Sequence, residues 1–253
     1  MMIFTLARRE LRSLFLSPLA WAILAIVQFI LAYLFMSQLQ EFLLIQAKLT
    51  TIENAPGVTQ LVIVPLYGSA AFIMMLVTPL LTMRLISEER RNSSLALLMS
   101  APVSMTEIIV GKYLGMLGFA AIMIGMMTLM PLSLYFAGSL DSGLLLSIVL
   151  GISLLLAAFI SIGLYMSSLT AQPTIAAMST FGMLLMLWII DWAGGKASDA
   201  AASGLLEYLS LLRHFEAFSK GIFNSSDLVY YILFISLFLI LSIRRLDGDR
   251  LQR

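Results

Sequence analysis

Long runs of uncharged, mostly apolar residues alternate along the chain with short polar segments. A helix needs about 20 apolar residues to cross a bilayer, and these runs are long enough. Residues 142–190 contain no charged side chain and are too long for one helix, so the polar stretch 167–173 divides them into two. The pattern predicts six membrane-spanning helices, at about residues 19–40, 60–86, 104–137, 143–168, 173–193 and 227–245.

Residues 2–17, ahead of the first predicted span, form a different pattern. On a helix, one face is apolar and the other basic, through Phe4, Ala7, Leu11, Leu14 and Phe15 on one side and Arg8, Arg9 and Arg12 on the other. We interpret this segment as an amphipathic helix in the headgroup region, with Pro18 turning the chain into the membrane. The alternative is an ordinary positively charged flank of the first span. The arginines lie among the apolar residues and no small-residue cleavage site follows, which excludes a signal peptide.

A charged segment from Arg84 to Lys112 separates the second and third spans. Inside it, Ser94 can cap the N-terminus of a helix, and Pro102 cannot continue one. The residues between them include a short apolar patch. We therefore predict a short amphipathic helix within residues 88–102 that docks against a partner.

The segment between the last two spans is too polar to cross the membrane, yet it keeps apolar stretches. Within about residues 197–223 we predict short helices at the outer surface. Their candidate functional residues are His214, Phe215, Lys220 and Gly221.

Composition agrees with a membrane protein. The 253 residues are 60% hydrophobic and 11% charged, and the mean hydropathy is +1.00. Soluble domains contain about 25% charged residues, so an all-α integral membrane protein is expected. The net charge of +1 gives no bulk attraction to nucleic acid, and the absence of cysteine removes disulfide and thiolate chemistry.

The distribution of basic residues predicts the orientation. Of the 15 lysines and arginines, only Lys48, Lys196, Arg213 and Lys220 lie on one side of the predicted spans. The others lie in the N-terminal segment, the central charged segment and the C-terminal tail. Loops rich in Lys and Arg stay in the cytoplasm, so both termini are expected there.

The sequence offers little for catalysis. Gly194-Gly195-Lys196 resembles the end of a phosphate-binding loop, but Ile190 and Ala197 stand where that motif needs Gly and Ser or Thr. No Asp, Glu or Lys lies in a span interior, so no intramembrane ion pair is expected. We expect a chain that is not an enzyme and that binds no cofactor or metal.

Two further features leave alternatives open. His214 is the only histidine, and we favour a structural or interfacial role, with a hydrogen bond to Glu216 or a lipid headgroup, over catalysis.

Small residues at Gly111-x-x-x-Gly115 and Ser147-x-x-x-Gly151 let helices approach closely. Packing within one chain and a seam between two chains both fit that spacing.

The central segment resembles the signature loop of type-2 ABC exporter permeases. The matching residues are Glu89 and Arg90, then Leu95, Leu97 and Leu98, then Pro102 and Val103, and finally Glu107, Gly111 and Lys112. Ser93, Ser94 and Ala96 depart from the family's Gly, Thr and Glu, and Ala96 lacks the carboxylate for a salt bridge to the ATPase. The resemblance implies a coupling helix in a groove of the ATPase subunit. Its expected contact residues are Glu88, Glu89, Arg90, Leu95, Leu97, Leu98 and Pro102.

The resemblance covers most of the chain and carries further expectations. Residues 214–234 are similar to the gliding-motility subgroup of these permeases. The N-terminal helix corresponds to the family's elbow helix. The expected partners are two copies of an ATPase, which hold ATP and Mg, a second permease half that is identical or related, an extracytoplasmic auxiliary subunit, and membrane lipid. The implied location is the bacterial inner membrane, and the implied function is export of an amphipathic or lipid-linked molecule from the cytoplasmic leaflet. The alternative is a subunit that relays ATPase motion to an extracytoplasmic partner without moving cargo.

Overall fold

The computed structural model describes residues 2–49, 56–92, 103–136, 140–194 and 210–251. Regular structure in these residues is helical throughout. Six helical segments in the described part of the chain are long and apolar enough to cross a membrane, which confirms the predicted all-α fold with six spans.

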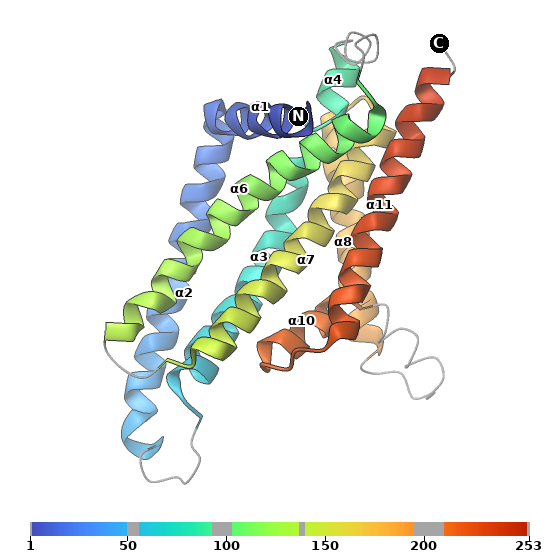
Figure 1. Cartoon of the computed structure of the whole chain (residues 1–253). Helices are drawn as coiled ribbons and strands as arrows, with labels where there is room; N and C mark the ends of the chain where they lie inside the picture. Colours follow the sequence, from blue (N-terminus) through green and yellow to red (C-terminus); the bar gives the residue numbers. More distant parts are fainter. Residues whose placement is uncertain (1, 50–55, 93–102, 137–139, 195–209, 252–253) are drawn as a thin grey trace.

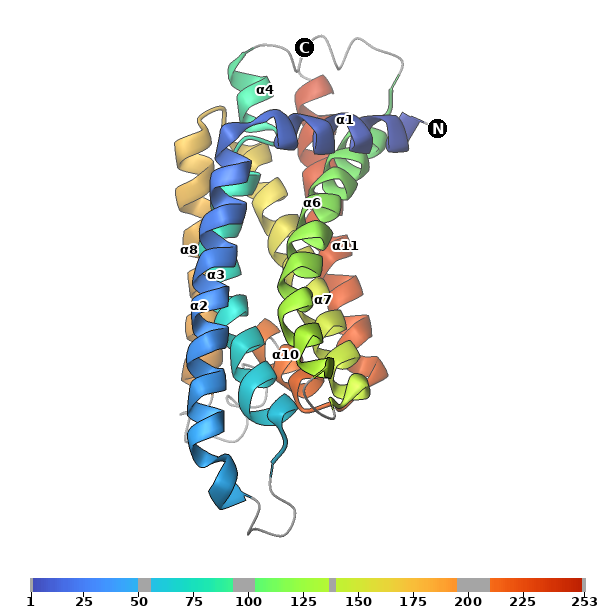
Figure 2. The ribbon, with the colours of Figure 1, turned by 90° about the vertical axis from the view of Figure 1, so that its left-hand side faces the viewer.

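The six segments run alongside one another (Figures 1 and 2). They are α2 (Pro18–Leu49), a π-helix (Thr59–Ile63) that continues into α3 (Val64–Thr82), α6 (Met105–Ser133), α7 (Ser142–Leu169), α8 (Pro173–Gly194) and α11 (Ser225–Leu251). Short helices lie at the ends of this bundle: α1 (Met2–Leu16) and α4 (Ser87–Arg91) at the end that holds both chain termini, and α10 (Leu211–Ser219) at the opposite end. A 3-10 helix (Leu134–Phe136) follows α6.

Helix α7 forms the centre of the bundle. It packs against α3, α6, α8, α10 and α11, and it is more deeply buried than the other spanning helices. The closest approach is at Gly163, where an added Cβ atom would lie 2.6 Å from the Cβ of Thr82 on α3. Only a glycine permits this contact between the two helices.

Local sequence signals account for where several helices begin. Ser104 and Glu107 form a capping box at the start of α6, with a distance of 3.2 Å from the Glu107 amide nitrogen to Ser104 Oγ. Asp141 caps α7 through the Leu144 amide at 3.1 Å. Pro173 is the first residue of α8, where its missing N–H costs nothing.

The second span differs from the continuous helix predicted over residues 60–86. Its helix α3 ends at Thr82, the chain turns through residues 83–86, and α4 then begins at Ser87. Pro79 lies inside the last turns of α3 and removes one backbone donor there. The remaining hydrogen bonds of the turn come from another helix, as described below.

The first span is also longer than expected. Helix α2 continues to Leu49 instead of ending near residue 40, because residues 41–49 contain no Gly or Pro that would stop it.

Candidate functional site

A buried lysine joins three helices at the end of the molecule that holds both termini. Lys112 Nζ, near the start of α6, lies 2.9 Å from Glu89 Oε1 on α4 and 3.3 Å from Glu10 Oε2 on α1. The Lys112 side chain is 6% exposed and both carboxylate side chains are 21% exposed. These ion pairs join the first turns of α6 to the short helices α1 and α4 at the end of the bundle, outside the span interiors to which the sequence prediction referred. We call these three residues the Lys112 cluster.

The close packing of α1 on α6 explains how Glu10 reaches Lys112. A Cβ atom added at Gly111 would lie 2.7 Å from the Cβ of Leu6, and one added at Gly115 would lie 2.7 Å from the Cβ of Glu10. The glycines thus let the backbone of α6 approach α1 directly. The structure assigns this small-residue motif to packing within the chain, which was one of its two interpretations.

Most of the predicted apolar face of α1 is its packed face, because Ala7, Leu11, Leu14 and Phe15 are partly buried against the bundle. Glu10 lies on the packed side, whereas Phe4, which was expected on the apolar face, is 76% exposed. Arg8, Arg9 and Arg12 are exposed on the outer side, as expected for the basic face.

The turn between α3 and α4 is held by Ser167 at the end of α7. The Ser167 hydroxyl oxygen accepts hydrogen bonds from the Ile86 and Ser87 amides, each at 3.1 Å, and donates one to the Met83 carbonyl at 3.1 Å. Ser167 is fully buried. The sequence interpretation treated this serine only as part of the break between the fourth and fifth spans. One side chain of α7 in fact replaces the backbone partners that a continuous helix would have supplied.

Arg90 ties α4 to two more helices. One of its guanidinium nitrogens donates to the Ser168 carbonyl at 2.9 Å, and the same nitrogen forms an ion pair with Asp249 near the end of α11. Asp249 also lies 3.8 Å from Arg245 on the same helix. Helix α4 is therefore linked through charged side chains to α1, α6, α7 and α11.

The described residues cover only part of the predicted coupling contact. Glu89 and Arg90 lie in these ionic contacts, and Glu88 is exposed beside them. Leu95, Leu97, Leu98 and Pro102 fall outside the described residues. Sequence reasoning matched Glu89 and Lys112 to the family motif without pairing them. It missed Glu10 and Asp249, although any charge next to an apolar span needs a partner when it is buried.

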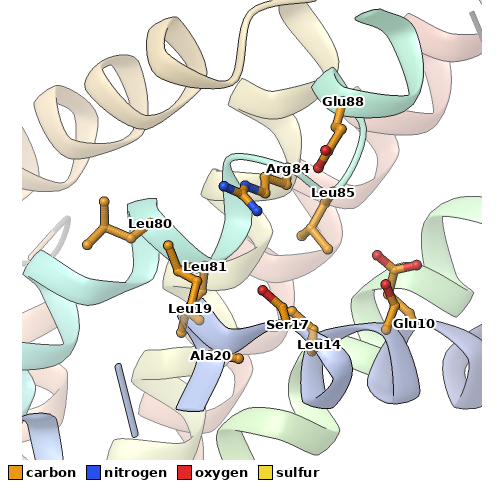
Figure 3. Close-up of a pocket in the computed structure, with 11 residues that line it drawn as sticks. Glu10, Leu14, Ser17, Leu19, Ala20, Leu80, Leu81, Arg84, Leu85 and Glu88 are labelled. Atoms are coloured by element: carbon orange, nitrogen blue, oxygen red, sulfur yellow. The ribbon is translucent and has the colours of Figure 1, made fainter. Parts of the chain in front are cut away.

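A small cavity lies beside the Lys112 cluster, where α1 meets α2 and the end of α3. Its volume is about 120 Å³. Figure 3 shows an aliphatic lining with the charged side chains of Glu10, Arg84 and Glu88 around it. Packing at this joint is therefore not complete, in contrast to the tight contacts between α1 and α6.

At the opposite end, His214 on α10 pairs with Asp227 at the start of α11. His214 Nδ1 lies 2.6 Å from Asp227 Oδ1, and both side chains are 10% exposed. The imidazole also stacks on Tyr230, with ring centroids 4.0 Å apart. The predicted hydrogen bond from His214 to Glu216 was wrong, because Glu216 instead lies on the exposed side of α10, 3.7 Å from Lys220.

Helix α10 is fixed to α7 at the Ser147-x-x-x-Gly151 motif. The Ser147 hydroxyl donates to the Phe218 carbonyl at 2.9 Å, and an added Cβ at Gly151 would lie 2.6 Å from the Phe218 Cβ. Phe215 is buried against the same surface. Gly221 ends α10 at φ +74°, a conformation that other residues rarely adopt. The predicted helices before residue 210 lie outside the described residues.

A second cavity, of about 520 Å³, lies beside α10 and between α3 and α8. Most of its lining is apolar, and it is also lined by three charged side chains, those of Asp191, Glu216 and Lys220. Gly68 on α3 faces open space there, since nothing lies within 4 Å of an added Cβ. Within the described ranges, no group of three or more His, Asp or Glu side chains could hold a metal ion.

Comparison with known proteins agrees with this architecture. The sequence model of a family described as "ABC-2 family transporter protein" matches residues 4–249, nearly the whole chain. No curated protein matches the sequence.

Proposed function

The chain belongs to the ABC-2 family of transporter membrane proteins, and on that premise we propose that it is the permease subunit of an ATP-driven exporter. Members of this family are in general membrane components without catalytic activity that work with an ABC ATPase. ATP and Mg would accordingly be bound by the partner. We further propose two ATPase copies, a second permease half that is identical or related, and a place in the inner membrane with both termini in the cytoplasm. The gliding-motility subgroup remains our proposed relationship within the family.

The observation that carries this proposal is the position of α4. It begins the predicted coupling segment, residues 88–102, and its Glu89 and Arg90 make ionic contacts to α6 and α11. Lys112 on α6 pairs in turn with Glu10 on α1. Closure of an ATPase dimer against this segment would therefore move several helices at once. The turn held by Ser167 gives α4 a joint with α3, and the cavity beside Glu88 leaves room for a small displacement.

The cavity beside α10 supports an amphipathic cargo. It combines an apolar lining with charged side chains at one end, and pockets of a few hundred cubic ångströms hold ligands of drug or lipid-fragment size. We propose that an amphipathic or lipid-linked molecule leaves the cytoplasmic leaflet and reaches this cavity near the outer surface.

A second candidate function is mechanotransmission to an extracytoplasmic auxiliary subunit. The attachment of α10 to both α7 and α11 favours this function. The Ser147 hydroxyl on α7 donates a hydrogen bond to the Phe218 carbonyl, and the Tyr231 hydroxyl on α11 donates one to the Leu211 carbonyl at 2.7 Å. Movement of α7 and α11 would therefore reach the outer surface through α10. In this case the chain would move no cargo of its own.

The first experiment tests the coupling contact. The chain is co-expressed with its ATPase and purified in detergent, and ATP turnover and bound ATPase are measured for Leu97→Arg and Leu98→Arg. Both substitutions are expected to release the ATPase. Ile222→Arg, at an exposed position at the other end, is the matched control. If the ATPase stays bound to both variants as to wild type, residues 88–102 are not the coupling contact.

A second measurement separates the two candidate functions. The complete complex is reconstituted in proteoliposomes with fluorescent lipid analogues, and ATP-dependent movement between leaflets is recorded. Movement that requires a catalytically active ATPase supports export. ATP turnover that remains coupled to the permease while no analogue moves supports mechanotransmission.

A further inference from the structure

One face of α1 carries three exposed arginines. Arg8, Arg9 and Arg12 are exposed, and among the described residues none of them forms an ion pair or a side-chain hydrogen bond. Together with Thr5 they line a shallow groove of about 350 Å³. We call these three arginines the arginine patch.

The charge of the arginine patch is not compensated from within α1. Its one acidic residue, Glu10, lies on the opposite, packed face and is already engaged by Lys112. Three guanidinium groups that form no ion pair with any described residue favour an anionic ligand, and the planar fork of arginine suits a phosphate in particular.

Apolar side chains flank the arginine patch on the same helix. Phe4 is 76% exposed and Leu16 is 74% exposed, one at each end of α1. Just beyond, at the start of α2, Trp21 is 57% exposed and donates its indole N–H to the Phe15 carbonyl at 2.8 Å. Cations between exposed apolar groups at the end of membrane spans are typical of a helix at the headgroup level.

We propose that the arginine patch binds the phosphate of an anionic phospholipid, with Arg8 and Arg12 as its main contacts. These two residues are four apart, so their Cβ atoms lie about 6 Å from each other on one side of the helix. That spacing lets both guanidinium groups reach one phosphate. Phe4 and Leu16 would contact the acyl chains of the surrounding lipids, which an acidic surface of a soluble subunit could not supply.

The bound lipid would also act on the Lys112 cluster. The packed face of α1 contacts α6 through Gly111 and Gly115, and Glu10 joins the same helix to Lys112. A lipid that fixes the outer face of α1 therefore stabilises one of the three helices that meet at Lys112. This site is independent of whether the ATPase docks on residues 88–102.

The test uses native mass spectrometry of the full chain in detergent with an equimolar mixture of dioleoyl phosphatidylglycerol and dioleoyl phosphatidylcholine. Wild type is expected to retain one phosphatidylglycerol in preference to phosphatidylcholine. The double variant Arg8→Gln/Arg12→Gln is expected to lose that preference by at least about tenfold, given the attraction of each arginine near an anionic surface. The matched control is Arg244→Gln/Arg250→Gln, which removes two exposed arginines at the same end of the molecule.

Three results would overturn the proposal. The first is equal retention of both lipids by wild type. The second is an equal loss of phosphatidylglycerol in the two double variants, which would show only a general effect of net charge. The third combines unchanged lipid retention by Arg8→Gln/Arg12→Gln with release of the ATPase when this variant is co-purified with it, which would assign the arginine patch to the ATPase. Unchanged circular dichroism of both variants serves as the folding control.

Discussion

Replacing Lys112 by Met tests whether the Lys112 cluster holds the three helices together. The substitution keeps an unbranched side chain one atom shorter than lysine and leaves the Glu10 and Glu89 carboxylates facing each other without their cation. Removal of one partner from a fully buried ion pair costs about 3–5 kcal/mol. Both carboxylates keep about a fifth of their exposure, so solvent reduces this value. We expect a loss of roughly 2–3 kcal/mol in the free energy of unfolding.

The measurement is unfolding of the purified protein by sodium dodecyl sulfate, followed by circular dichroism. Lys220→Met is the matched control, because Lys220 forms an exposed pair with Glu216 at 3.7 Å. An exposed pair of this kind contributes about 0.5 kcal/mol or less. Adding Glu10→Gln and Glu89→Gln to Lys112→Met removes the uncompensated charges and is expected to restore most of the lost stability.

Two outcomes would refute this reasoning. If Lys112→Met destabilises the protein no more than Lys220→Met does, the ion pairs at Lys112 do not hold the helices together. If the triple variant is no more stable than Lys112→Met alone, the loss comes from packing of the lysine side chain and not from the carboxylates left behind.

Three further substitutions test other contacts by the same measurement. Gly115→Leu should separate α1 from α6 and cost about 1–3 kcal/mol, whereas Gly125→Leu, with open space around its Cβ, should cost little. Ser167→Ala should cost about 1–3 kcal/mol, because two buried amides of the turn between α3 and α4 lose their acceptor. His214→Phe should cost roughly 2–4 kcal/mol by leaving the Asp227 carboxylate buried, and adding Asp227→Leu should recover part of that loss.

Each of these predictions has its own contradicting result. Equal effects of the two glycine substitutions would show that α1 does not need close approach to α6. A stable Ser167→Ala variant would mean that the turn finds other hydrogen-bond partners. A double variant at His214 and Asp227 as unstable as His214→Phe would attribute the loss to packing on Tyr230, on which the imidazole stacks.

The sequence alone predicted the number of membrane spans, the helix ahead of the first span and a short helix within residues 197–223, where the structure has α10. Lipid offers no hydrogen-bond partners, so an apolar run that crosses it must form a helix, and its length gives the span directly. Polar stretches such as residues 167–173 then divide runs that are too long. The lengths of the apolar runs and the positions of the polar breaks therefore determine the order of the helices along the chain.

Only the tertiary structure decided which faces of the helices meet. In a soluble protein the polar face of a helix points to water, but lipid and protein core are both apolar, so a spanning helix does not reveal its buried face. Along the chain, the two partners of Lys112 lie 102 and 23 residues away from it. Ser167 accepts a hydrogen bond from the amide of Ser87, which lies 80 residues away. These contacts depend on how α1, α4, α6 and α7 pack, and no local pattern in the sequence specifies that packing.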